Sequence, residues 1–188
     1  MRYRHLVFIF FVYITSHMNA YALVNGELIF SKKWITVSTE STEKVLSGYE
    51  NKASLIFDPI PLIPVGLGLS YSSLNIDNGL AEVVESATYD ELNLALVTWL
   101  PLFSYEPFMQ LSIPVYSKLK FKMKSDNEKR DDGSASGMNL DFGIRKTIFP
   151  FVSVILKVGV GIAKIDKFEA KERDFNHKFV GLGVQVGL

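Results

Sequence analysis

Hydrophobic side chains alternate with small or polar ones, with a period of two residues, through most of this chain. In the segment 64–76, Val65, Leu67, Leu69 and Tyr71 fall on one face, and only glycine and serine stand between them. The same alternation returns in residues 138–145, 154–162 and 180–188. Because the side chains of a strand point alternately to its two faces, this pattern predicts β-strands.

The less hydrophobic face of these strands is rich in glycine, as at Gly159, Gly161, Gly181 and Gly183. In a soluble β-sandwich that face would meet water, where Lys, Glu and Thr are favoured and where glycine weakens a strand. The crowded interior of a narrow closed barrel accepts small residues and a few paired charges, while its outer face is an apolar band in lipid. The pattern therefore favours a transmembrane barrel.

Two kinds of break separate the alternating runs. Short apolar breaks that contain proline occur at residues 58–64, 100–107 and 149–150. Longer polar breaks alternate with them, at residues 39–44, 77–87, 125–136 and 166–176. Short turns at one end and longer charged loops at the other are typical of outer-membrane barrels, in which the turns lie in the periplasm.

We predict an all-β fold, an eight-stranded antiparallel up-and-down transmembrane β-barrel. The strands expected are residues 27–38, 45–57, 64–76, 88–100, 107–124, 136–148, 151–165 and 177–188. An even number of strands places both ends of the barrel domain on the periplasmic side. The first strand carries apolar residues on both faces, as the neighbours Leu28 and Ile29 show, so we expect a bulge or a late start there.

The N-terminus has the features of a secretory signal peptide. Arg2 and Arg4 precede the apolar run 6–14, and the small residues Ala20 and Ala22 follow a short polar stretch. That run is far shorter than the roughly 20 residues of a spanning helix. We therefore predict a signal peptide at residues 1–22, cleaved after Ala22, and an outer-membrane β-barrel domain at residues 23–188.

Charge and composition narrow the classes of function. Lys and Arg total 20 and Asp and Glu total 20, so the formal net charge is +0. Proteins that bind nucleic acid carry a strong basic excess, and we expect no such partner. The sequence has no cysteine, which excludes disulfides and thiolate metal sites.

The signal peptide, the alternating strands with G-x-G spacing and the strand at the C-terminus together resemble the small bacterial outer-membrane β-barrel superfamily. Its members include the transmembrane domain of outer-membrane protein A, protein X and the W-type barrels. The resemblance implies a place in the Gram-negative outer membrane, with outer-membrane lipid and lipopolysaccharide as partners. It also implies that the barrel-assembly machinery recognises the C-terminal strand, although Leu188 stands where that strand usually ends in an aromatic residue.

The alternation places a set of polar residues on the lumen face of the expected strands. They are Glu50, Lys52, Glu91, Asn93, Asp141, Arg145, Lys157 and Gln185. An unpaired charge in a narrow interior of low dielectric is costly, so we expect a paired network that plugs the lumen. The alternative is that the same residues line a gated path for ions or solutes.

Four lysines share one face of the fifth expected strand, namely Lys118, Lys120, Lys122 and Lys124. By the alternation of that strand we expect a basic strip at the outer mouth of the lumen. There it could attract anions, or form a solvated rim paired with the acidic residues of 126–132. If a bulge reversed the alternation, the strip would instead meet lipopolysaccharide phosphates.

Catalysis has little support in the sequence. Barrel enzymes that modify lipid A need a histidine base beside a serine, but only His177 remains after export, and it is followed by Lys178 and Phe179. We therefore expect no enzyme, no catalytic residue, no cofactor and no metal. The leading hypothesis is a non-enzymatic envelope protein whose charged loops give structural or surface-interaction function. The alternatives are a narrow porin-like or W-type transport barrel for small solutes and, third, a lipid A-modifying enzyme.

Overall fold

The computed structural model describes residues 24–38, 43–58, 64–77, 84–102, 105–123, 129–132, 135–168 and 171–187. The predicted signal peptide, residues 1–22, lies outside these residues. Across the described ranges there is no helix long and apolar enough to cross a membrane.

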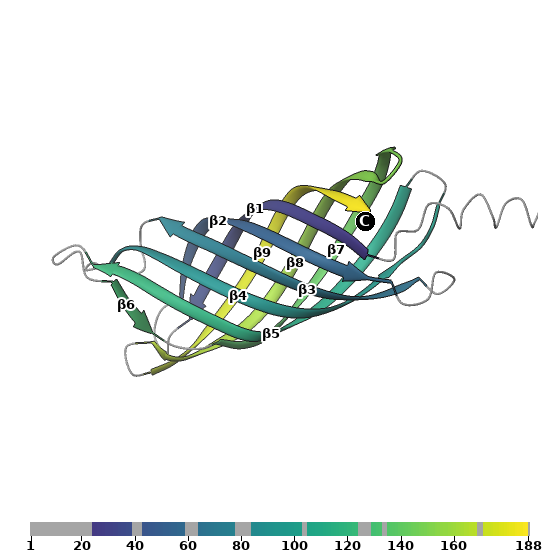
Figure 1. Ribbon diagram of the computed structural model, residues 1–188. Helices are drawn as coiled ribbons and strands as arrows, with labels where there is room; N and C mark the ends of the chain where they lie inside the picture. Colours follow the sequence, from purple (N-terminus) through teal and green to yellow (C-terminus); the bar gives the residue numbers. More distant parts are fainter. Residues whose placement is uncertain are drawn as a thin grey trace, which may run out of the picture.

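The described residues form nine strands, eight of which make the wall of a barrel (Figure 1). These eight are β1 (Val24–Ser38), β2 (Glu43–Phe57), β3 (Val65–Asp77), β4 (Val84–Trp99), β5 (Tyr105–Met123), β7 (Ala135–Phe149), β8 (Val152–Phe168) and β9 (Lys171–Gly187). Neighbours along the chain pair in antiparallel fashion, and pairing of β1 with β9 closes the sheet. The predicted eight-stranded antiparallel barrel is confirmed.

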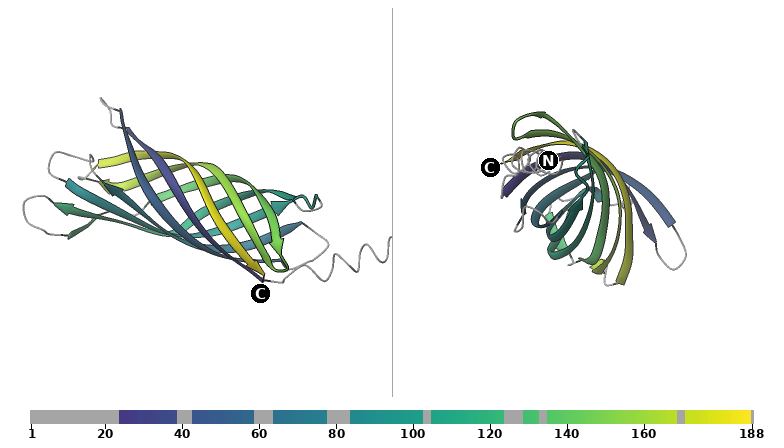
Figure 2. Two further views of the ribbon diagram at one scale, coloured as in Figure 1. Left: turned by 90° about the horizontal axis from the view of Figure 1, so that it is seen from above. Right: turned by 90° about the vertical axis from the view of Figure 1, so that its right-hand side faces the viewer.

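The strands run obliquely from one end of the barrel to the other (Figure 2). The starts of β1 and β3 and the end of β9 lie at the end that holds the short turns, since Asn25 pairs with Gly187 and Phe57 pairs with Leu67. We call this the turn end, and the opposite end the loop end. At the turn end, β7 and β8 are joined by Pro150 and Phe151, and Phe151 has a positive φ of 69°.

Two strands begin nearer the loop end than the sequence predicted. β9 begins at Lys171 and β4 at Val84, whereas the sequence predicted starts at residues 177 and 88. A short extra strand, β6 (Lys129–Asp132), pairs with β5 inside the predicted loop 125–136. The added residues of β6 and of the start of β9 are mostly charged, because they extend the hairpins beyond the outer apolar band. Phe175 and, at the start of β4, Ala87 are the exceptions, since they point inward and belong to a buried apolar cluster.

The expected irregularity of the first strand is wrong over the residues that the structure describes. β1 pairs with β2 without a register shift, from Val24 opposite Phe57 to Ser38 opposite Glu43. Its inward residues include Ile35, which is fully buried, and its outward residues include Leu28, which is 63% exposed. Both faces are apolar because the interior itself contains apolar layers.

A bulge does occur, but in β5. Tyr116 pairs with Leu92 and Pro114 pairs with Asn93, so Val115 is an extra residue in the ladder to β4. Val115 and Tyr116 are consecutive and both exposed. The bulge therefore exchanges the two faces of β5 on the side toward the loops.

The interior is packed in three layers. The layer near the loops is apolar and consists of Ile35, Val37, Leu46, Leu74, Ile76, Ala87, Tyr89, Leu119, Ala163 and Phe175. The layer near the turns is also apolar and consists of Ile29, Ile56, Ala95, Val97, Trp99, Phe108 and Ile155. Charged and polar side chains fill the space between them.

Lumen glycines make room for aromatic side chains. A Cβ atom on Gly143 would collide with the ring of Phe108, and one on Gly159 would collide with the ring of Phe179. Both aromatic rings are buried inside the barrel. The glycine-rich face seen in the sequence is therefore a requirement of interior packing, as expected for a narrow barrel.

Candidate functional site

All eight residues that the sequence assigned to a lumen network are buried in the structure. They are Glu50 and Lys52 on β2, Glu91 and Asn93 on β4, Asp141 and Arg145 on β7, Lys157 on β8, and Gln185 on β9. The structure brings most of them into one layer. Arg145 instead lies in the apolar layer near the turns.

Lys157 lies at the centre of this charged layer. It is fully buried, and its Nζ donates a hydrogen bond of 2.8 Å to Oε1 of Gln110. The same ammonium is 3.5 Å from Asp141 and 3.9 Å from Glu27, and both of those carboxylates are also completely buried. One cation therefore holds two acidic groups inside the barrel.

A second basic group shares the Asp141 carboxylate. Lys52 Nζ lies 3.4 Å from Asp141 Oδ2. On the neighbouring strand, Lys33 Nζ forms an ion pair of 2.6 Å with Glu50, and Ser31 donates a hydrogen bond of 2.9 Å to the other oxygen of Glu50. Each of the three lysines Lys33, Lys52 and Lys157 thus contacts a carboxylate within the layer, which offsets part of the cost of burying their charges.

Glu91 and Asn93 close the charged layer on the β4 side. Tyr89 donates a hydrogen bond of 3.2 Å to Glu91, which links the charged layer to the apolar layer near the loops. Asn93 is 1% exposed. Gln185 lies opposite Glu27 in the pairing of β9 with β1.

Sequence reasoning missed several members of the layer, among them Glu27, Lys33 and Gln110. Glu27 and Lys33 share the inward face of β1 with Ile29 and Ile35. The strand itself was predicted, but apolar residues on both of its faces left the inward face undetermined. Gln110 shares the inward face of the turn-end half of β5 with Ser112, and a strict alternation of that strand could have found it.

Arg145 closes the turn end of the interior. Its guanidinium carbon lies 5.5 Å from the ring centroid of Trp99 and 4.8 Å from that of Phe108. The guanidinium is also 3.6 Å from the carboxylate of Glu106. Stacking on aromatic rings is a favourable position for a partly desolvated guanidinium.

Asp58 lies at the same end, directly after the last residue of β2. It accepts a hydrogen bond of 2.9 Å from the side-chain amide of Asn25, whereas its other oxygen has no hydrogen-bond partner among the described residues. Burial raises the pKa of the Asp58 carboxyl from 3.8 to about 6, against the lowering effect of nearby Arg145. A buried carboxylate with one unpaired oxygen gains from taking up a proton.

His177 is placed inside the barrel and not on an accessible surface. Its side chain is 7% exposed and lies edge-on to the ring of Phe175 at 6.5 Å between centroids. Within the described part of the chain, neither ring nitrogen has a hydrogen-bond partner. The structure thus shows no serine hydroxyl bonded to this histidine among those residues.

The described residues also contain no group of three or more His, Asp or Glu side chains suited to a metal ion.

The predicted position of the basic strip at the lumen mouth is wrong. Because of the bulge at Val115, Leu119 points inward and is 2% exposed, while Lys118, Lys120 and Lys122 lie on the outer face. Lys120 forms an ion pair of 2.7 Å with Asp90 there. Lys124 lies outside the described residues.

Comparison with solved structures supports this fold, whereas comparison of sequences found nothing. No protein-family model matches the chain, and no curated protein matches its sequence. Neisserial surface protein A is 9% identical, with 87% of this chain and 97% of that chain covered and a TM-score of 0.66. The outer membrane protein OprG from Pseudomonas aeruginosa is 11% identical, with 88% and 95% covered and a TM-score of 0.54. The chain therefore has the fold of the small outer-membrane β-barrels, as the sequence resemblance implied.

Proposed function

We propose that this protein is an integral protein of the bacterial outer membrane whose interior is sealed, and that it acts through its charged loops and outer surface. It is exported through its signal peptide and inserted through recognition of its C-terminal strand. In this proposal it is not an enzyme, and it contributes to envelope structure or to contacts at the cell surface.

The packing of the interior carries the proposal. An ion that entered from the loop end would meet a layer that includes the rings of Tyr89 and Phe175, whose centroids are 5.7 Å apart. Beyond the charged layer it would meet a second layer, with Trp99 and Phe108 around Arg145. Transfer of an ion through two apolar layers carries a large desolvation cost. This supports a sealed barrel over the alternative of a transport barrel.

Conductance across a planar lipid bilayer tests the proposal. The folded wild-type protein should give no single-channel steps, whereas a channel-forming barrel inserted under the same conditions should give them. A variant with Tyr89→Ala and Phe175→Ala should also be silent, because the layer near the turns still closes the interior. Steps of constant size from the wild-type protein would support transport and contradict the proposal.

A further inference from the structure

The charged layer of the interior holds one more acidic group than basic groups. Among the described residues its four carboxylates and three ammonium groups are those of Glu27, Glu50, Glu91, Asp141, Lys33, Lys52 and Lys157. Arg145 does not make up the difference, because it lies at the turn end beside Glu106. The layer therefore carries one uncompensated negative charge, which is costly in an interior of low dielectric.

Glu27 is the carboxylate with the fewest favourable contacts. It is 2% exposed, and neither of its oxygens accepts a hydrogen bond from any described residue. The ammonium of Lys157 lies 3.9 Å away and donates its hydrogen bond of 2.8 Å to Gln110 instead. The other three carboxylates of the layer each accept a hydrogen bond from a side chain. The uncompensated charge of the layer therefore lies at Glu27.

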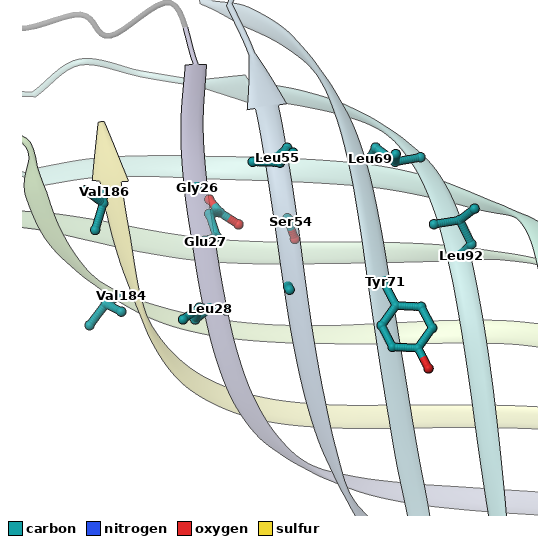
Figure 3. A pocket seen from close by; sticks show the side chains of 11 residues that line it. Gly26, Glu27, Leu28, Ser54, Leu55, Leu69, Tyr71, Leu92, Val184 and Val186 are labelled. Atoms are coloured by element: carbon teal, nitrogen blue, oxygen red, sulfur yellow. The ribbon is translucent and has the colours of Figure 1, made fainter. Parts of the chain in front are cut away.

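Glu27 belongs to a row of inward-facing side chains that crosses five strands. Strand pairing places it opposite Gln185 of β9 on one side and Ser54 of β2 on the other. Figure 3 shows the side chains of Glu27 and Ser54 on their neighbouring strands. The row continues through Ser70 of β3 to Asn93 of β4. All five residues are buried, and in each an oxygen atom has no hydrogen-bond partner within the described part of the chain.

The chemistry of these unpartnered atoms indicates a positively charged ligand. Opposite residues of paired strands have Cβ atoms about 5 Å apart, so the side-chain oxygens of Glu27, Gln185 and Ser54 can surround a common point. Carboxylate and neutral oxygens are the ligands that hard metal cations prefer. Water could donate hydrogen bonds to the same oxygens, but it would leave the negative charge of the layer uncompensated.

We propose that this row binds one monovalent metal cation, sodium or potassium, inside the barrel. Glu27, Gln185 and Ser54 are its ligands, and Ser70 and Asn93 bind water molecules of its hydration shell. A single positive charge neutralises the layer, whereas a divalent ion would leave an excess of positive charge. The cation stabilises the fold, and the proposal goes beyond the proposed function because it holds whether or not the barrel conducts.

Urea titration of the protein, folded in detergent in different salts, tests the proposal. Sodium chloride or potassium chloride replaces choline chloride at constant total salt, because choline screens charges equally but cannot be coordinated by these oxygens. One ion bound to the folded chain and none to the unfolded chain should lower the equilibrium constant of unfolding about tenfold for each tenfold rise in metal-ion concentration near saturation. Equal stability in all three salts would overturn the proposal and leave water as the occupant of the row.

Three variants locate the effect. Glu27→Gln should abolish the dependence on the metal ion, because it removes the negative charge. Ser54→Ala leaves all charges in place and should raise the metal-ion concentration needed for the same effect about tenfold, the loss expected for one polar contact to a charged group. Asp174→Asn removes a carboxylate from the exposed face of β9 and should keep the wild-type dependence. The proposal is overturned if Glu27→Gln retains the dependence, or if Asp174→Asn loses it as well.

Discussion

Replacing Lys157 by methionine should lower the free energy of unfolding by about 3 to 5 kcal/mol, the range found when one partner of a buried ion pair is removed. Lys157 is fully buried, and it faces the carboxylates of Asp141 and Glu27. Asp141 would still have Lys52 as a partner. Glu27 would have no cation within ion-pair distance among the described residues, and its two oxygens already accept no hydrogen bond there.

Urea titration of the protein folded into lipid vesicles measures this effect. Adding Glu27→Gln to Lys157→Met should restore more than half of the lost stability, because the double variant loses one charge of each sign. Lys178→Met removes a lysine from the exposed face of β9 and should change the free energy of unfolding by less than about 0.5 kcal/mol. Equal losses for Lys157→Met and Lys178→Met would show that the interior network does not stabilise the fold.

Asp58 should make the stability of the protein fall as pH rises from about 4 to about 6. Its pKa is raised from 3.8 to about 6 in the folded protein, so in this range the folded state binds more protons than the unfolded state. A group of this kind destabilises the folded state once it is charged. The effect on the free energy of unfolding is at most about 3 kcal/mol, because a pKa change of one corresponds to roughly 1.4 kcal/mol and solvent at the end of the barrel screens part of it.

Asp58→Asn isolates this contribution from the other titrating groups. The asparagine oxygen can still accept the hydrogen bond from Asn25, but the side chain stays neutral at every pH. The variant and the wild type should have similar free energies of unfolding at pH 4, and the variant should be more stable at pH 8. A difference between them that is the same at both pH values would contradict the raised pKa.

The alternation of residues predicted most of the barrel because one physical rule governs it. Where one face of a strand meets lipid, a shift of one residue would place polar groups such as Asp141 and Lys157 in the lipid. The sequence therefore predicted eight strands and placed eight polar residues on their inward faces. Strand segments beyond the apolar band, such as the start of β9 and all of β6, lack this constraint and were predicted as loops.

The basic strip was misplaced because one extra residue reverses all later positions of a strand. The sequence carries a signal for this in β5, where Val115 and Tyr116 are adjacent and both apolar after Pro114. Proline has no N–H group for the ladder, and two adjacent outward residues mark a bulge. If the bulge is included when the alternation of β5 is followed, Lys118 and Lys120 fall on the outer face.

The three-layered interior could not be predicted from alternation alone. Ile29 and Ile35 on β1 made the inner face of that strand look like a lipid-facing one. Only the register between strands shows that such residues meet others, such as Trp99 and Phe175, across the lumen.

Heat-modifiability on a detergent gel tests most directly the claim that this chain forms a closed barrel in a membrane. A closed barrel of this kind resists unfolding by detergent at room temperature, because every strand of its wall is paired on both sides. The purified protein should require detergent to stay in solution, and unboiled and boiled samples should migrate at different positions. A protein that is soluble without detergent and migrates identically in both samples would contradict the barrel.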